Sequence, residues 1–378
     1  MKTRFAGRPA IAPHLRHPSA LLLALALCCS GAASAADSGG YSTATGGGDV
    51  APVYADSMSA LQSAVAWGNK LVIYTGNEDD AIKSAEADVC GQWSKSPREI
   101  LIGSSNLTII GAPGSSANFG IRLKGARNVI IRDMTIGMMQ GGARNGDIIG
   151  IQAGSRNIWL HHNNFFNKHV DCPDTPDGDT TFDGMIDIRD DVDNITISYN
   201  LLHDHLKVGL AGSSDHDNAT RHLTFHHNIY SNVRARLPLQ RYGFVHAYNN
   251  IYDGVEVSGI NVRQDGQALI EGNWFQNARN PVTSRDSPVA GYWDLRNNNI
   301  SSPADFAKYN ITWDVSRSTL KNASDWTTTK PFPAAALTYA YSADPVQCVH
   351  DHLAEFAGPG KGGKTLVCPL AAAQKAAP

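Results

Sequence analysis

The sequence has no large excess of charge of either sign. Its 378 residues carry 32 Lys and Arg against 35 Asp and Glu, which leaves a formal net charge of -3. A net charge this small identifies no partner, and we expect none among nucleic acids. Long apolar runs are also lacking. The apolar run at residues 20–29 is shorter than the roughly 20 residues that a membrane-spanning helix needs, so we expect no membrane partner.

Cysteine is sparse, and none of the six cysteines forms a Cys-x-x-Cys motif. This absence argues against a zinc site. The adjacent histidines at residues 161–162 and 226–227 argue the same way, because neighbouring side chains of a strand point to opposite faces. Without Cys28 and Cys29, which lie in the amino-terminal segment, four cysteines remain. Four cysteines allow three disulfide pairings, and the sequence alone does not choose among them.

The amino-terminal residues 1–35 have the pattern of a secretory signal peptide. An apolar stretch at residues 20–29 follows a basic segment and precedes the small residues 33–35, which are typical of a cleavage site. The basic residues are Lys2, Arg4, Arg8 and Arg16. We therefore expect a secreted, extracellular protein with cleavage near Ala35 and Ala36. We expect residues 36–378 to form a single domain that acts as a monomer.

Two short helices and a strand are predicted before the main repeating region. The first helix has Asp56 as a possible cap, Met58, Leu61 and Val65 on one face, and Gly68 as its stop. A strand is expected at residues 70–75 and a second helix at residues 78–87. After residue 90 the pattern changes from helical to repetitive.

From residue 106 onward a unit recurs in which alternating apolar residues precede an asparagine and an apolar or aromatic pair. The asparagines before these pairs are separated by 36, 28, 22, 23 and 26 residues, and they are Asn164, Asn200, Asn228, Asn250, Asn273 and Asn299. Repeats of this length are typical of the coils of a parallel β-helix, in which the asparagines would form an internal ladder. A sandwich or barrel is the alternative, but its strands usually recur every 8 to 12 residues or so.

One repeat is longer than the others, and its extra residues coincide with an acidic segment. The step from Asn164 to Asn200 exceeds the shortest step by 14 residues, and the excess falls on CPDTPDGDTTFDG at residues 172–184. Insertions in a solenoid emerge on one face, which is often the binding face. Basic residues such as Lys207 and Arg241 follow, so the region could hold a hard cation and an anionic substrate together. Strand alternation places Asp187 and Arg189 on the same outward face.

A series of motifs in order along the chain identifies a family. They include CGQWSKSPR from Cys90, CPDTPDGDTTFDGMIDI from Cys172, KVGLAGSSD from Lys207, ARLPLQR from Ala235 and NPVTSR from Asn280. From about residue 40 to its end the chain resembles the secreted pectate lyases of polysaccharide lyase family 1 from plant-pathogenic bacteria. The resemblance implies an all-β fold, a right-handed parallel β-helix with short amino-terminal capping helices and a carboxy-terminal helix and loop region packed on it. It also implies calcium-dependent β-elimination of polygalacturonate, the pectate of plant cell walls, in virulence.

The resemblance also implies roles for individual residues. Three aspartates match the family's calcium ligands, Arg236 matches the base that takes a proton from carbon 5 of galacturonate, and four further basic residues match substrate contacts. The ligands are Asp147, Asp183 and Asp187, the substrate contacts are Lys207, Arg241, Arg189 and Arg263, and the disulfides are Cys90–Cys172 and Cys348–Cys368.

The sequence departs from the family at three positions. Asp183 stands where close relatives have Glu, and Asn145 replaces a carboxylate two residues before Asp147, so the number of calcium ions in the substrate complex is left open. His161 stands where the family usually has Asp, and we interpret that change as structural.

Two other functions compete with this hypothesis. A polygalacturonase-type hydrolase would need paired carboxylates, for which Asp183 and Asp187 could serve, but the R-x-P-x-x-R motif beginning at Arg236 would be unexplained. A non-catalytic pectin-binding β-helix would need neither Arg236 nor the three aspartates. The sequence therefore favours the lyase.

Overall fold

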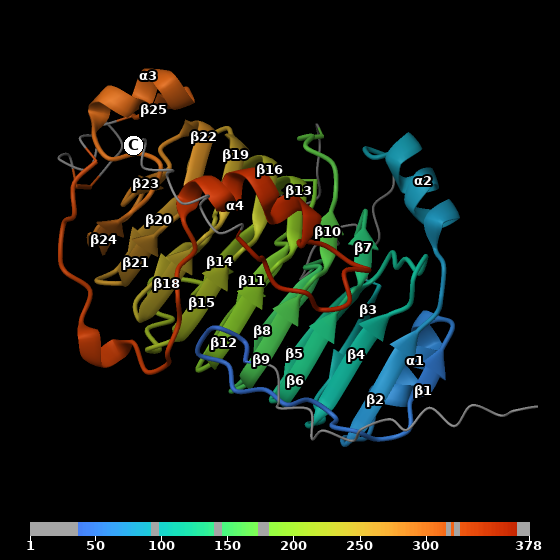
Figure 1. Cartoon of the computed structure of the whole chain (residues 1–378). Helices are drawn as coiled ribbons and strands as arrows, with labels where there is room; N and C mark the ends of the chain where they lie inside the picture. Colours follow the sequence, from blue (N-terminus) through green and yellow to red (C-terminus); the bar gives the residue numbers. More distant parts are fainter. Residues whose placement is uncertain are drawn as a thin grey trace, which may run out of the picture. The chain divides into compact units, whose positions relative to one another are not determined.

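The computed structural model describes residues 37–91, 98–139, 146–172, 181–314, 319–320 and 326–368. Its strands form three sheets of 10, 8 and 7 strands, and successive segments of the chain visit the sheets in turn (Figure 1). Neighbouring strands within each sheet run parallel, as between β9 and β12 or β11 and β14. This arrangement confirms the right-handed parallel β-helix, and it excludes the sandwich and the barrel.

The ten-stranded sheet contains the apolar segments that recur in the sequence. Its members, in order, are β1 (Val53–Ala55), β2 (Lys70–Tyr74), β4 (Leu107–Gly111), β6 (Arg127–Arg132), β9 (Arg156–His161), β12 (Asp193–Ser198), β15 (His222–His226), β18 (Phe244–Tyr248), β21 (Gln267–Glu271) and β24 (Tyr292–Arg296).

The other two sheets complete each coil. The eight-stranded sheet is made of β3 (Glu99–Ile102), β5 (Gly120–Lys124), β8 (Ile149–Gln152), β11 (Ile186–Ile188), β14 (Gly209–Ala211), β17 (Leu239–Arg241), β20 (Ile260–Arg263) and β23 (Val282–Thr283). The seven-stranded sheet is made of β7 (Thr135–Gly137), β10 (Asn164–Phe166), β13 (Leu201–Lys207), β16 (Ile229–Ala235), β19 (Ile251–Val255), β22 (Trp274–Arg279) and β25 (Ile311–Thr312).

Both predicted amino-terminal helices are present. Helix α1 spans Met58–Val65 and buries Leu61 and Val65, as its pattern predicts. Its cap is Ser57, whose hydroxyl accepts a hydrogen bond from the backbone N–H of Ala60, so the prediction of Asp56 as cap was wrong by one residue. A serine in extended conformation caps a helix as well as an aspartate does. Helix α2 spans Asp79–Ala87.

A carboxy-terminal segment packs on the β-helix. It contains α4 (Val346–His352), and the apolar residues Val349 and Leu353 pack with Tyr199 and Trp274. Shorter elements precede or follow it, namely α3 (Phe306–Tyr309) and the 3-10 turns Pro303–Asp305, Ala334–Ala336 and Leu353–Glu355. Among the described residues no helix is long and apolar enough to cross a membrane.

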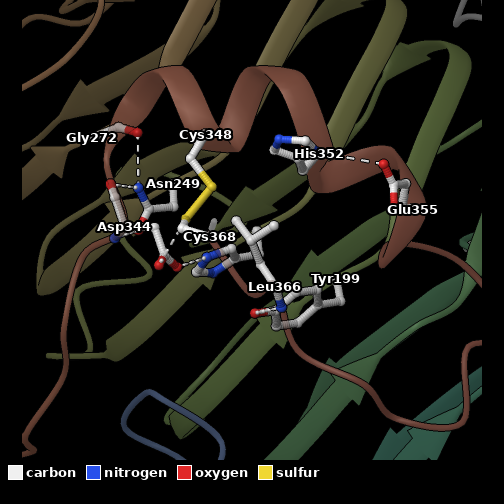
Figure 2. Close-up of a disulfide and its surroundings, with 10 residues drawn as sticks. Tyr199, Asn249, Gly272, Asp344, Cys348, His352, Glu355, Leu366 and Cys368 are labelled. Carbon is white, nitrogen blue, oxygen red and sulfur yellow. Dashed lines mark hydrogen bonds and ion pairs between the residues drawn. A yellow bond between two sulfur atoms is a disulfide. The ribbon is translucent and has the colours of Figure 1, made fainter. Parts of the chain in front are cut away.

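Figure 2 shows how this segment is fastened. The Cys348–Cys368 disulfide joins α4 to a cysteine 20 positions further along the chain. The backbone N–H of Leu366 donates to the Tyr199 hydroxyl at 3.1 Å, and Asn249 exchanges hydrogen bonds with the backbone of Asp344. The predicted packing of a carboxy-terminal region on the β-helix is therefore present.

An asparagine ladder runs through the interior, but its two ends differ from the prediction by one residue. Each member's Oδ1 accepts from the Nδ2 of the preceding member, and the members are Asn163, Asn200, Asn228, Asn250, Asn273 and Asn298. Asn164, predicted for the ladder, instead begins β10 opposite Leu201. Asn299, the other wrong member, bonds the backbone of Phe275. Consecutive asparagines at both places made the register ambiguous.

Buried rings fill the space beside this ladder. Tyr230, Tyr252 and Phe275 stack in successive coils with ring centroids 4.8 Å apart. Phe165 and Phe275 are fully buried, so both rings belong to the core. His161 and His162 are also buried and bond each other through their Nδ1 atoms at 2.8 Å. The potential metal-ligand group found among the described residues is composed of aspartates.

Candidate active site

A column of residues in the left-handed conformation crosses four neighbouring strands of the seven-stranded sheet. Asp204, Asn232, Gly254 and Asn277 occupy equivalent places in β13, β16, β19 and β22, and each has a φ between 48° and 74°. The left-handed conformation suits glycine, asparagine and aspartate better than other residues. The strands continue beyond these positions. β13 ends at Lys207, which lies opposite Ala235 of β16.

Three aspartates, Asp147, Asp183 and Asp187, meet in the eight-stranded sheet, and we name them the acidic trio. Asp147 precedes β8, Asp183 precedes β11, and Asp187 is the central residue of β11. One carboxylate oxygen from each lies within 4.8 Å of the other two. Asp147 and Asp187 are buried, whereas Asp183 is half-buried. The structure therefore brings together all three predicted ligands.

Gly184 makes this close approach possible. Its backbone N–H donates to Asp147 Oδ1 at 3.1 Å. A β-carbon at this position would lie 2.2 Å from Asp187 Oδ1 and 2.8 Å from Asp147 Oδ1, far inside contact distance. The position next to Asp183 therefore needs a residue without a side chain, and the sequence pattern did not reveal this requirement.

Burial and mutual repulsion disfavour the charged forms of the trio. Burial, together with the charge of Asp187, raises the pKa of Asp147 well above its usual range, and burial raises the pKa of Asp187. Arg189 Nη2 donates to Asp147 Oδ2 at 2.9 Å and to Asp187 Oδ2 at 2.8 Å. Burial lowers the pKa of Arg189, but the two carboxylates outweigh burial and raise it above its ordinary value. Arg189 thus compensates part of the trio's charge.

The donor set fits a hard cation. Asp187 Oδ1 is buried and has no hydrogen-bond partner within the part of the chain that the structure describes. A buried carboxylate oxygen left in this way costs free energy, and a bound cation would remove that cost. Carboxylate oxygens are the ligands that Ca²⁺ prefers. The three aspartates therefore suit calcium, and Asn145, which bears on a second ion, lies outside the described residues.

Arginines line an adjoining cleft of about 280 Å³, and we name it the basic cleft. The arginines are Arg236, Arg241, Arg263 and Arg285. Arg241 of β17 and Arg263 of β20 stand opposite each other in neighbouring strands. Asp215 Oδ1 accepts from Arg241 Nε at 2.9 Å and the backbone oxygen of Gly212 accepts from Arg241 Nη1 at 2.8 Å. Arg241 is therefore fixed in place before any ligand arrives.

Arg263 and Arg285 differ in how their charges are compensated. Burial, and then the charge of Arg241, lowers the pKa of Arg263 to about 10, and its Nε atom is buried without a partner among the described residues. Arg285 donates to Asp286 Oδ2 at 3.0 Å and to the backbone oxygen of Val257 at 3.1 Å. Sequence reasoning missed Arg285 as a cleft residue, although it ends the NPVTSR motif.

Arg236 joins the basic cleft to the acidic trio. It follows β16 with a φ of 70°, an unfavourable conformation for a side-chain-bearing residue and one that is common at functional sites. Its positive charge offsets part of the rise that burial causes in the pKa of Asp187, so the two groups are electrostatic neighbours. The backbone N–H of Gly209 bonds the oxygen of Arg236 at 2.9 Å, and that of Met185 bonds the oxygen of Lys207 at 3.2 Å. Asp183, Lys207 and Arg236 therefore stand on consecutive coils.

A disulfide holds the start of the segment that leads to Asp183. Cys90, just beyond α2, is bonded to Cys172, 82 residues away, and this is the pairing that the resemblance implies. Cys172 begins the acidic segment of residues 172–184, and Asp183 is the last acidic residue of that segment. The central part of the predicted insertion, residues 173–180, lies outside the described residues.

Comparison with known proteins agrees with this geometry. The profile of the pectate lyase family matches residues 16–362. Pectate lyase 1 of Pectobacterium atrosepticum is 51% identical over 352 residues, which are 88% of this chain and 93% of that protein. Pectate lyase B of Dickeya chrysanthemi is 50% identical over 352 residues, again 88% of this chain and 93% of that protein.

Solved structures of pectate lyase C are similar throughout. The enzyme from Erwinia chrysanthemi at pH 9.5 with 30 mM Ca²⁺ has a TM-score of 0.80 and 45% identity, over 88% of this chain and 99% of that chain. A variant of pectate lyase C with one arginine replaced by lysine, in complex with pentagalacturonic acid, has a TM-score of 0.81 with the same identity and coverage. The chain therefore belongs to the pectate lyase family and is a polysaccharide lyase.

Proposed function

We propose that this protein is a calcium-dependent pectate lyase that cleaves (1,4)-α-D-galacturonan by β-elimination and releases 4,5-unsaturated oligogalacturonides. The observation that carries the proposal is the acidic trio beside the basic cleft, with Arg236 between them. Such a site combines ligands for a hard cation with ligands for a polyanion. The pentagalacturonic acid and the Ca²⁺ in the pectate lyase C structures support both halves of the proposal.

Asp147, Asp183 and Asp187 would hold the calcium ion. Bound calcium would supply positive charge beside a substrate carboxylate, which makes the proton on the neighbouring carbon 5 more acidic. The buried oxygen of Asp187 without a protein partner supports this assignment. The cradle around Gly184 supports it as well, because it keeps the carboxylates of Asp147 and Asp187 close together.

Lys207, Arg241, Arg263 and Arg189 would bind substrate carboxylates. A guanidinium can donate two parallel hydrogen bonds to a carboxylate, which fixes both the position and the orientation of a uronate. Arg241 is already oriented by Asp215, so little entropy is lost when it binds. Arg189 would approach the substrate from the side of the trio, where it contacts Asp147 and Asp187.

Arg236 would act as the base. In its neutral form its guanidine takes the proton from carbon 5, and the electrons of that bond form the double bond between carbons 4 and 5. The bond between carbon 4 and the glycosidic oxygen breaks, and the leaving oxygen takes a proton from water. High pH favours this route because an arginine normally holds its proton. Because the chain belongs to the pectate lyase family, we reject the hydrolase and the non-catalytic pectin-binding protein as alternatives.

The metal requirement is the decisive test. We expect polygalacturonate to give an ultraviolet-absorbing unsaturated product when calcium is present, no product in excess chelator, and recovery when calcium is restored. Magnesium should substitute poorly because it demands stricter octahedral geometry. Asp187→Asn should raise the calcium concentration needed for half-maximal rate. Full activity in excess chelator, or saturated products, would contradict the proposal.

We also propose that the protein is exported with cleavage near Ala35 and Ala36. The signal-peptide pattern of residues 1–35 supports this, as do two disulfides, which persist in oxidising compartments. Amino-terminal sequencing of protein from the culture medium of an expressing bacterium should begin near residue 36. Retention of residues 1–35 on protein found only inside the cells would contradict export.

A further inference from the structure

We propose that His205 and Asn167 are positioning residues that hold Asp183 in place for the cation. The inference rests on the proposed calcium site and adds two residues to it that no ligand pattern in the sequence indicates. Both are buried, so neither offers an atom to the substrate. They act through Asp183, the half-buried member of the trio.

The contact begins at the imidazole of His205 in β13. Its Nε2 atom lies 2.8 Å from the backbone oxygen of Asp183, and its Nδ1 atom lies 3.2 Å from Nδ2 of Asn167. Asn167 follows β10, the strand that pairs with β13 in the seven-stranded sheet. The chain of contacts therefore runs from the seven-stranded sheet to the edge of the eight-stranded sheet.

The partners of Asn167 decide which nitrogen of His205 carries the proton. Oδ1 of Asn167 accepts the backbone N–H of Met139 at 2.9 Å, which turns Nδ2 toward the ring of His205. An amide Nδ2 can only donate, so Nδ1 of His205 accepts and its proton sits on Nε2. The Nε2–H then donates to the carbonyl of Asp183. The hydrogen bonds Met139–Asn167, Asn167–His205 and His205–Asp183 can therefore all form only when the ring of His205 carries its proton on Nε2.

Asp183 needs such a support because it lies outside the strand ladder. The first paired residue of β11 is Ile186, three positions later. By contrast, Asp187 is held by pairing with Gly150 and Leu210 on both sides. A carboxylate ligand on unpaired backbone loses more conformational freedom on binding, unless a neighbour fixes it beforehand. Residues that hydrogen-bond a metal ligand, without contacting the metal themselves, commonly influence the affinity for the metal.

The test compares calcium affinity among three variants by calorimetric titration with calcium chloride. His205→Leu removes the donor, and we expect its dissociation constant for calcium to rise about 10- to 100-fold. His205→Gln keeps a side-chain amide donor and should recover part of the affinity. The matched control is His246→Gln, because His246 is equally buried but lies in β18 of the ten-stranded sheet, with Tyr339 as its partner. It should lower the melting temperature and leave the calcium dissociation constant unchanged.

Nitrogen NMR of the ring tests the same inference without any metal. In the unaltered protein His205 should be protonated at Nε2, and Asn167→Leu should shift the population toward the Nδ1-protonated form. Protonation at Nδ1 in the unaltered protein would overturn the positioning role. So would a calcium affinity of His205→Leu equal to that of the unaltered protein. Failure of the unaltered protein to bind calcium would instead overturn the cation site, and the ring spectrum would still decide the role of His205.

Discussion

The arginines of the basic cleft are held in different ways, which is consistent with different roles for them in the proposed reaction. Arg241 is anchored by Asp215 and by the backbone of Gly212, which suits a residue that binds a fixed carboxylate. Arg285 donates hydrogen bonds to Asp286 and to the backbone oxygen of Val257, so it supports the wall of the cleft. Arg236 follows a strand in a left-handed conformation beside Asp187. Its place in the basic cleft and beside Asp187 distinguishes Arg236 from the other arginines and supports its proposed role as the base.

Arg236→Lys should remove turnover and leave binding. Lysine keeps the charge but lacks the reach of the planar guanidine, so we expect kcat to fall about 100- to 10,000-fold, the range for loss of a general base. The affinity for polygalacturonate and for calcium should change little, because a proton acceptor acts chiefly in the transition state. Initial rates and calorimetric binding measure both quantities.

Arg241→Ala is the matched control for the base. It should raise KM strongly as well as lower kcat, since Arg241 would pair with the substrate before reaction. Turnover by Arg236→Lys close to that of the unaltered enzyme would require a different base.

Arg263 should make substrate binding sensitive to alkaline pH. Burial and Arg241 lower its pKa to about 10, so its charge is present below that pH and is lost above it, whereas an ordinary arginine would stay charged. The KM for polygalacturonate should therefore rise as pH increases through about 10. Arg263→Met should show a high KM that does not rise further there.

The same pKa shift has a consequence for stability. The buried charge of Arg263 disfavours folding at pH values below about 10, and this penalty fades as the pH rises toward the ordinary pKa of arginine. Arg263→Met should consequently melt at a higher temperature than the unaltered protein at neutral pH.

A KM that is constant from about pH 9 to about pH 11 would contradict the shifted pKa of Arg263.

At the scale of elements, the asparagine ladder joins each coil to the next. Asn163 accepts from the backbone of Met134, donates to the backbone of Ile131 and donates to Asn200. Its neighbour Asn164 accepts one hydrogen bond from His203 on the outer side of the coil. Of the two adjacent asparagines, Asn163 therefore fixes the register of its coil and Asn164 does not.

Asn163→Ala should destabilise the protein much more than Asn164→Ala. The first change leaves several buried polar groups without partners, at about 1 to 3 kcal/mol each, so a total loss of about 2 to 5 kcal/mol is expected. The second should cost less than about 1 kcal/mol, since Asn164 is only half-buried. Guanidinium-induced unfolding measures both. Equal losses would contradict the register of the ladder.

At the scale of the whole molecule, two disulfides close loops of different length. Cys90–Cys172 spans 82 residues and Cys348–Cys368 spans 20. In the chain-entropy account these loops stabilise by about 4.5 and about 3.3 kcal/mol, because the longer loop restricts the unfolded chain more. The first links α2 to the segment that leads to Asp183, and the second ties α4 to the end of the described chain.

Removal of Cys90–Cys172 should therefore cost more stability than removal of Cys348–Cys368. We expect the double alanine variant of the first pair to unfold at a lower guanidinium concentration than that of the second, at the same slope. Calcium affinity should fall in the first variant and stay unchanged in the second. A reversed order of midpoints would contradict this ranking.

The sequence by itself determined the repeat and the chemical types gathered in the region of the longest repeat. Asparagines at regular steps and alternating apolar residues specify coils because every coil must bury the same face. The motifs that resemble the family then identified the aspartates and the basic residues, among them Asp187 and Arg236. These were recognisable because they are patterns of residue type and spacing, which a sequence records directly.

Only the tertiary structure decided which of two adjacent asparagines faces inward, as at Asn163 and Asn164. It alone placed Arg189 against two members of the trio, Arg285 in the cleft wall, and His205 behind Asp183. These contacts join residues on different coils, so their distances depend on how far each turn advances and how each strand bends. A one-residue change of register reverses the face of a side chain, and local spacing carries no information about that choice where like residues are consecutive.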